Sequence, residues 1–313
     1  MSGTTASENQ PADTVRAPVR ALLHHIVDYA GLFPPAKLDM DTVASSYATY
    51  LNGPHAWMLD RVIVPVARFA EFETAARDHL PRGAEDEPWH VSALARPAGD
   101  AGLAEDLDAI ARFNKAHAEP DNGLAVVDAI ELRADSAGAV ESALDLMPDE
   151  IMPYFEFPAG DDPRGMIAAL AGVDAAAKIR TGGVTPDLFP SPETVARFIA
   201  ACGSAEVPFK ATAGLHHPVR HRDETVGADA FGFLNVFVAG ALAFLRGHDA
   251  EALLDVLTET SADAFQFGPA ALVYGDERLD ATEVEDARLV FAVSFGSCSF
   301  TEPIEDLQTL GLI

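Results

Sequence analysis

Short β-type runs alternate with helical runs along this chain, and eight such β-type runs occur between residues 25 and 295. Each is nearly continuous in apolar character, which is typical of parallel strands covered by helices. Eight repeats favour closure into a cylinder, so we expect an α/β fold with a single (β/α)8 TIM barrel. The expected strands are His25–Tyr29, Arg61–Phe69, His90–Arg96, Val126–Ala134, Ile151–Phe157, Ala176–Thr181, Pro208–Ala213 and Leu289–Phe295.

Helical periodicity fills the intervals between these strands, most clearly at 102–117, at 191–202 and in the apolar stretch after Gly232. Another helix is expected near 41–51, whereas residues 22–29 (LLHHIVDY) fit either a first strand or a helix. The segment 249–285 exceeds one helical unit, which predicts a helix pair and a covering segment before the last strand. We expect one barrel domain at 18–313 after a polar, disordered tail at 1–17.

The charge of the chain restricts its partners. It has 21 basic and 49 acidic residues, a formal net charge of −28, which disfavours nucleic acid and anionic membranes as partners. Such acidity is typical of a halophilic, high-salt cytoplasm. No apolar run approaches the roughly 18 residues of a membrane span, and the N-terminus does not resemble a signal peptide. Two cysteines cannot form a disulfide framework, so a cytoplasmic protein is expected, with homo-oligomerisation left open.

Charged residues interrupt four neighbouring strands. Side chains alternate between the two faces of a strand, and the apolar residues suit the helix layer, so the charged ones point inward. Neighbouring strands are about 4.8 Å apart, which brings these groups into one polar cluster. The inward residues on strands four to seven are Glu131 and Arg133, then Glu156, then Lys178 and Arg180, then Lys210 and Thr212.

Three cations beside two carboxylates in a barrel mouth favour an anionic ligand, since buried ion pairs seldom stabilise a protein better than apolar packing does. A cationic neighbour lowers the pKa of a lysine, and a neutral lysine attacks carbonyl carbons to form a Schiff base. The alternative is that these pairs serve packing alone, in a non-catalytic barrel binding protein.

Three short segments carry a resemblance. Lys178-Ile-Arg-Thr-Gly-Gly, Phe209-Lys210-Ala-Thr-Ala-Gly and Phe295-Gly-Ser-Cys-Ser resemble class I aldolases of the deoxyribose-phosphate type. The resemblance covers only the last third of the chain. It departs from the family at Arg180, where the family has a small residue, and at His216-His217, which have no counterpart there.

The resemblance implies a carbon–carbon lyase that forms a Schiff base with a small anionic, phosphorylated or carboxylated carbonyl substrate. Lys178 would form the imine, Lys210 would lower its pKa, and Glu156 or Glu131 would relay protons. Loop amides would hold the anion, and no cofactor is expected. The candidate substrate-binding residues are Arg133, Arg180, Thr212, Gly214, His216, His217, Gly296, Ser297, Cys298 and Ser299.

Other residues leave alternatives open. His216, His217 and His221, with Asp223 and Glu224, have the composition of a divalent-metal site, which would fit a metal-dependent barrel lyase or hydrolase. Asp28 joins the site if residues 24–29 form the first strand. Cys298 fits either a nucleophile or a small residue chosen for packing.

Overall fold

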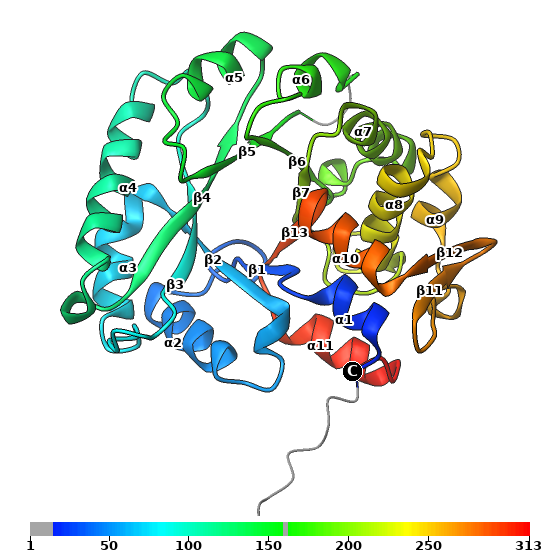
Figure 1. Cartoon of the computed structure of the whole chain (residues 1–313), viewed down its shortest axis with the longest axis horizontal. Helices are drawn as coiled ribbons and strands as arrows, with labels where there is room; N and C mark the ends of the chain where they lie inside the picture. Colours follow the sequence, from blue (N-terminus) through cyan, green and yellow to red (C-terminus); the bar gives the residue numbers. More distant parts are fainter. Residues whose placement is uncertain (1–14, 159–161) are drawn as a thin grey trace, which may run out of the picture.

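The computed structural model describes residues 15–158 and 162–313, and in this part of the chain eight parallel strands close into a barrel (Figure 1). The expected TIM-barrel fold is confirmed. Around the barrel the strand order is β1-β13-β7-β6-β5-β4-β3-β2. These strands are β1 (Val27–Tyr29), β2 (Leu59–Pro65), β3 (Trp89–Leu94), β4 (Ala125–Arg133), β5 (Met152–Glu156), β6 (Ala176–Arg180), β7 (Phe209–Thr212) and β13 (Ala292–Ser297).

Helices surround the barrel as an outer layer (Figure 1). Four of the described helices start at side-chain caps, where a side chain accepts a hydrogen bond from a backbone amide of the first turn. The capping residues are Asp39, Ser136, Ser191 and Asp280. None of the described helices has both the length and the apolar character needed to cross a membrane. The helices are α1 (Ala17–Leu23), α2 (Met40–Leu51), α3 (Phe69–Ala76), α4 (Leu103–His117), α5 (Ala137–Leu144), α6 (Arg164–Ala168), α7 (Pro192–Ala205), α8 (Phe233–Arg246), α9 (Leu254–Thr258), α10 (Ala281–Val290) and α11 (Thr301–Thr309).

Helix α8 is the apolar helix expected after Gly232, and its residues are buried continuously from Phe233 to Ala243. It packs against α7, α9 and α10, so the stretch from Phe233 to Ala243 has no solvated face. Its one polar residue in this stretch, Asn235, donates to the carbonyls of Val256 and Glu259 and so ties α9 to α8.

The first strand is shorter than predicted. Residues Leu22 and Leu23 belong to α1, and β1 begins only at Val27, so the segment contains both of the structures that its sequence fits. Residues 1–14 of the predicted tail (1–17) lie outside the described residues. The prediction is wrong for Ala17, which begins α1.

Two further strand boundaries are wrong. The apolar run predicted as Leu289–Phe295 starts with the end of α10, where Leu289 and Val290 are 65% and 54% exposed, and β13 continues to Ser297. An apolar run by itself does not distinguish a helix end from a strand. At the end of β2, residues 66–68 turn into a 3-10 helix, and Phe69 begins α3.

Segment 249–285 contains the expected helix pair, α9 and the start of α10, but also an unpredicted antiparallel sheet. This sheet consists of β10 (Gln266–Phe267), β11 (Ala271–Tyr274) and β12 (Glu277–Asp280), and it lies outside the barrel beside α10 (Figure 1). The loop after β7 forms a second unpredicted element, the hairpin of β8 (His221–Asp223) and β9 (Ala228–Ala230). Both elements have short strands, which leave a weak periodic signal in the sequence.

Candidate functional site

Two lysines share one carboxylate inside the barrel. Lys178 Nζ lies 2.7 Å from Glu131 Oε2, and Lys210 Nζ lies 2.6 Å from Glu131 Oε1. The two lysines are register partners on the adjacent strands β6 and β7, and both are buried. The alternation of side chains along the strands therefore places these three residues correctly.

Each lysine has a second carboxylate partner. Lys178 Nζ lies 2.7 Å from Glu156 Oε2, and the same Glu156 accepts a hydrogen bond from Arg180 Nε at 3.3 Å. On the other side, Lys210 Nζ lies 2.6 Å from Asp28 Oδ2. The result is a continuous ionic chain in the order Asp28, Lys210, Glu131, Lys178, Glu156 and Arg180.

Asp28 belongs to this ionic chain. The sequence left open whether Asp28 joins the site, and the structure shows that it does. Ser294 Oγ donates to Asp28 Oδ2 at 2.7 Å, and Ser92 Oγ donates to Glu131 Oε1 at 2.8 Å. Neither serine was singled out from the sequence. Their signal is a single hydroxyl in an otherwise apolar strand, which is weak because a buried serine is also compatible with packing.

Asp28 also corrects the expected charge balance. Three carboxylates, not two, face the three cations Lys178, Lys210 and Arg180. The charges of these six side chains therefore sum to zero. The net positive charge available to an anion therefore comes from Arg133, the inward cation of β4, which is exposed to the barrel mouth.

The expectation that a cationic neighbour lowers the pKa of a lysine is wrong for Lys210. Burial, the largest influence, lowers the pKa of Lys210, but the charges of Asp28 and Glu131 together raise it above the usual lysine range. Burial likewise opposes ionisation of Glu131 and Glu156. The contacts with the lysines nevertheless hold the pKa of both carboxyls below the usual glutamate range. Lys210 is therefore a fixed cation in contact with Asp28 and Glu131.

A cavity of about 860 Å³ opens at the C-terminal ends of the strands, which is where TIM barrels carry their active sites. Lys178, Glu131 and Glu156 line it, whereas Lys210 lies beneath it and is 1% exposed. Eight of the candidate substrate-binding residues also line it, namely Arg133, Arg180, Thr212, Gly214, His216, His217, Gly296 and Cys298.

Ser297 and Ser299, the other two candidates, are not part of the lining. Ser297 Oγ donates to the Ser299 carbonyl at 2.7 Å, and Ser299 Oγ accepts a hydrogen bond from the Glu302 amide at 3.2 Å. The two serines therefore shape the loop between β13 and α11, and the residue between them, Cys298, reaches the cavity.

Apolar residues and a tight glycine contact complete the walls. Phe33, Pro34 and Pro35 line the cavity from the loop after β1, so this loop covers part of the mouth. Gly214 has a φ of +79°, and a Cβ on it would lie 3.0 Å from the Gly182 Cα. Only glycine allows the loops after β6 and β7 to approach this closely.

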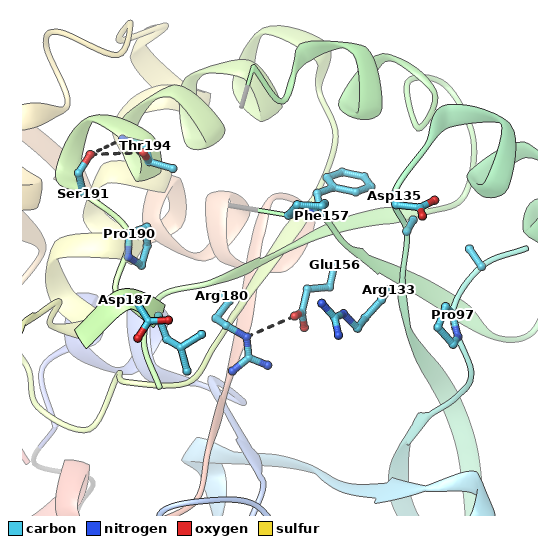
Figure 2. A pocket seen from close by; sticks show the side chains of 14 residues that line it. Pro97, Arg133, Asp135, Glu156, Phe157, Arg180, Asp187, Pro190, Ser191 and Thr194 are labelled. Atoms are coloured by element: carbon cyan, nitrogen blue, oxygen red, sulfur yellow. Dashed lines mark hydrogen bonds and ion pairs between the residues drawn. The ribbon is translucent and has the colours of Figure 1, made fainter. Parts of the chain in front are cut away.

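A second cavity, of about 670 Å³, adjoins the first and shares Arg133, Glu156 and Arg180 with it (Figure 2). Figure 2 shows the guanidinium groups of Arg133 and Arg180 close to the Glu156 carboxylate, with Asp187 and Asp135 farther out. Among the described residues, Arg133 has no carboxylate partner, and its guanidinium donors face the junction of the two cavities.

The histidines after β7 bind different partners. His216 Nδ1 lies 2.9 Å from Glu302 Oε2, and His217 Nδ1 lies 2.6 Å from Asp306 Oδ2. His221 Nδ1 bonds to the Val219 carbonyl at 3.1 Å. Within residues 15–158 and 162–313, no three His, Cys, Asp or Glu side chains come together as a metal site would require.

His216 has one more contact on its other ring nitrogen, where Nε2 lies 3.9 Å from Cys298 Sγ. Glu302, which orients this histidine, was not among the residues singled out from the sequence. It lies in the first turn of an ordinary amphipathic helix, and nothing in its local sequence distinguishes it from the other acidic residues of the chain.

Comparison of the chain with protein-family models, with curated proteins and with solved structures gives no match.

Proposed function

We propose that this chain is a carbon–carbon lyase of the aldolase type, which forms a Schiff base between Lys178 and a small anionic carbonyl compound. One observation carries the proposal: of the two buried lysines, Lys178 lines the cavity, and Lys210 does not. A carbonyl carbon in the cavity is therefore accessible to one amine only, and that amine has carboxylates on both sides.

The carboxylates give the proton steps a route. Lys178 loses a proton to Glu156, attacks the carbonyl carbon, and forms a carbinolamine whose oxygen then takes a proton. Loss of that oxygen as water gives the imine. Glu156 suits this exchange, because it contacts Lys178 and also lines both cavities. The imine, protonated on nitrogen, accepts the electron pair of the bond between the α and β carbons of the substrate. As this bond breaks, the hydroxyl on the β carbon gives its proton to Glu156 and becomes the carbonyl of the released aldehyde, and the other fragment remains on Lys178 as an enamine.

Lys210 has an electrostatic role in this proposal. Its raised pKa keeps it charged, and its contact holds Glu131 ionised beneath Lys178. Glu131 thus remains a fixed negative charge, which favours a cationic iminium at the position of the Lys178 nitrogen. Asp28 in turn neutralises Lys210, so the positive charge of Lys210 does not disfavour the iminium.

We place the anionic group of the substrate at Arg133 and Arg180, and not at the amides of the loops after β7 and β13. Glu302, Asp223 and Glu224 line the cavity on the side of those loops, and their charges repel an anion. Arginine binds carboxylates and phosphates through two parallel hydrogen bonds. Arg133 has the donors for this, because no described carboxylate occupies them.

Exchange of the α-protons of keto acids tests the proposal, because an enamine exchanges them with solvent. Pyruvate in D₂O should lose its methyl proton signal in the presence of the protein, as followed by NMR. Lys178→Arg keeps a cation between the two carboxylates but does not form an imine, so it should abolish the exchange. Lys115→Arg, at an exposed position on α4, is the matched control. Exchange that continues in Lys178→Arg would contradict the proposal.

A further inference from the structure

Cys298, His216 and Glu302 form a connected set at the rim of the larger cavity. The thiol Sγ lies 3.9 Å from His216 Nε2, and His216 Nδ1 lies 2.9 Å from Glu302 Oε2. The three residues come from two separate segments: His216 lies in the loop after β7, and Cys298 and Glu302 lie where β13 leads into the first turn of α11. All three line the cavity that holds Lys178.

The order of these contacts is that of an activated nucleophile. A carboxylate that accepts the proton of one imidazole nitrogen leaves the lone pair of the other nitrogen free to act as a base. In this site the base nitrogen is Nε2, which faces the thiol. A nucleophile, a base and a group that orients the base are the three components of covalent catalysis by cysteine or serine.

The thiol needs such a base. Burial raises the pKa of Cys298, although a hydrogen bond from the Ala36 backbone opposes this, so the sulfur is protonated at rest. Packing alone does not require an imidazole and a carboxylate in line with it. Cys202, the other cysteine, shows the contrast: it is fully buried in α7 among apolar neighbours.

We infer that Cys298 is a second nucleophile of this cavity, and that it adds reversibly to the carbonyl carbon of a small aldehyde. The sulfur–carbon bond forms as the carbonyl π bond breaks. His216 Nε2 takes the thiol proton and delivers it to the carbonyl oxygen, which becomes the hydroxyl of a hemithioacetal. The addition involves no oxidation or reduction and no further reactant.

The identity of the aldehyde rests on the proposed function, because cleavage at Lys178 releases an aldehyde into this cavity. Strand β7 separates β6, which carries Lys178, from β13, which precedes Cys298. The two outer strands are therefore about 10 Å apart. An aldehyde released at Lys178 meets Cys298 inside the cavity, and the hemithioacetal retains it there for the reverse, bond-forming reaction.

Alkylation of the thiol tests this inference directly. In a Cys202→Ala chain Cys298 is the one remaining thiol. We expect iodoacetamide to alkylate this thiol, and we expect glycolaldehyde to protect it against alkylation. NMR with carbonyl-¹³C glycolaldehyde should show the signal of a hemithioacetal carbon, and Cys298→Ser should remove this signal. His216→Gln should slow alkylation by about 10²-fold, the usual contribution of a general base. His248→Gln removes a histidine that is paired with Glu277 and does not line the cavity, so it should leave the alkylation rate unchanged.

The outcomes separate this inference from the proposed function. A hemithioacetal that forms equally in the Lys178→Arg chain supports the thiol site, whatever the result of the pyruvate exchange. The inference is overturned if glycolaldehyde gives no protection, or if His216→Gln and His248→Gln alkylate at the same rate. In either case, exchange measured in the unsubstituted chain would still support Lys178.

Discussion

Lys210 Nζ lies 2.6 Å from Asp28 Oδ2, although 182 positions separate the two residues in the chain. Asp28 is on β1 and Lys210 is on β7, and β13 lies between them where the barrel closes. The contact forms only when the first strand pairs with the last, so closure of the barrel and assembly of the ionic chain are one event.

Removing the Lys210 cation should destabilise the fold. Lys210→Met leaves Asp28 and Glu131 buried without their shared partner, and removal of one member of a buried ion pair costs about 3–5 kcal/mol. Urea unfolding measures this loss. Lys115→Met, at an exposed position on α4, should stay within about 0.5 kcal/mol of the unsubstituted protein. Equal stability of the two variants would show that the ion pairs contribute nothing to the fold.

The Glu156 carboxylate should make stability depend on acid pH. The pKa of Glu156 is lowered in the folded protein, so its charge stabilises the fold above the unfolded value of about 4.3. That contribution is lost as the pH falls through the lower, folded pKa. The difference in unfolding free energy between the unsubstituted protein and Glu156→Gln should therefore be constant near pH 7 and shrink below about pH 4. Parallel curves down to pH 2 would refute this.

Arg133 should determine affinity for the anionic end of a ligand. A hydrogen bond to a charged group contributes about 1.5–3 kcal/mol, so Arg133→Ala should weaken pyruvate binding by about 10–100-fold. Calorimetric titration measures the change. Acetaldehyde, which lacks the carboxylate, should bind both proteins equally. Arg164→Ala, at an exposed position on α6, is the control. An equal loss for both ligands would argue against an anion contact.

Gly214 should not tolerate a side chain. Gly214→Ala places a Cβ 3.0 Å from the Gly182 Cα in a left-handed backbone conformation, which costs about 1–2 kcal/mol. Gly138→Ala, in α5, meets open space and should instead stabilise the protein by about 0.5–1 kcal/mol. Thermal unfolding of the two variants compares the signs. A stabilising Gly214→Ala would mean that the loops after β6 and β7 do not need this close approach.

Strand periodicity explains why much of the site follows from the sequence. A period of two fixes which face of β4, β5, β6 and β7 is inward, and it therefore places Glu131, Glu156, Lys178 and Lys210 inside the barrel. The partner of each lysine does not follow in this way. Asp28 reaches Lys210 only because of the stagger between β1, β13 and β7, which the sequence of a single strand does not specify.

Loops have no such period, and there the sequence predicted less. Ser297, Cys298 and Ser299 were assigned together to ligand binding, yet only Cys298 lines the cavity. Hydrogen bonds of the two serines to the Ser299 carbonyl and the Glu302 amide set this orientation. The connection from Cys298 through His216 to Glu302 depends on the relative positions of two segments, because His216 is 82 positions from Cys298 in the sequence.

The most direct measurement is borohydride trapping of the imine, followed by peptide mass mapping, with a panel of small aldehydes and keto acids. The account predicts a reduced adduct at Lys178 and an unmodified Lys210, because one amine lines the cavity and the other lies buried beneath it as a fixed cation. An adduct at Lys210 would contradict this assignment. An active protein that is modified at neither lysine would exclude the imine altogether.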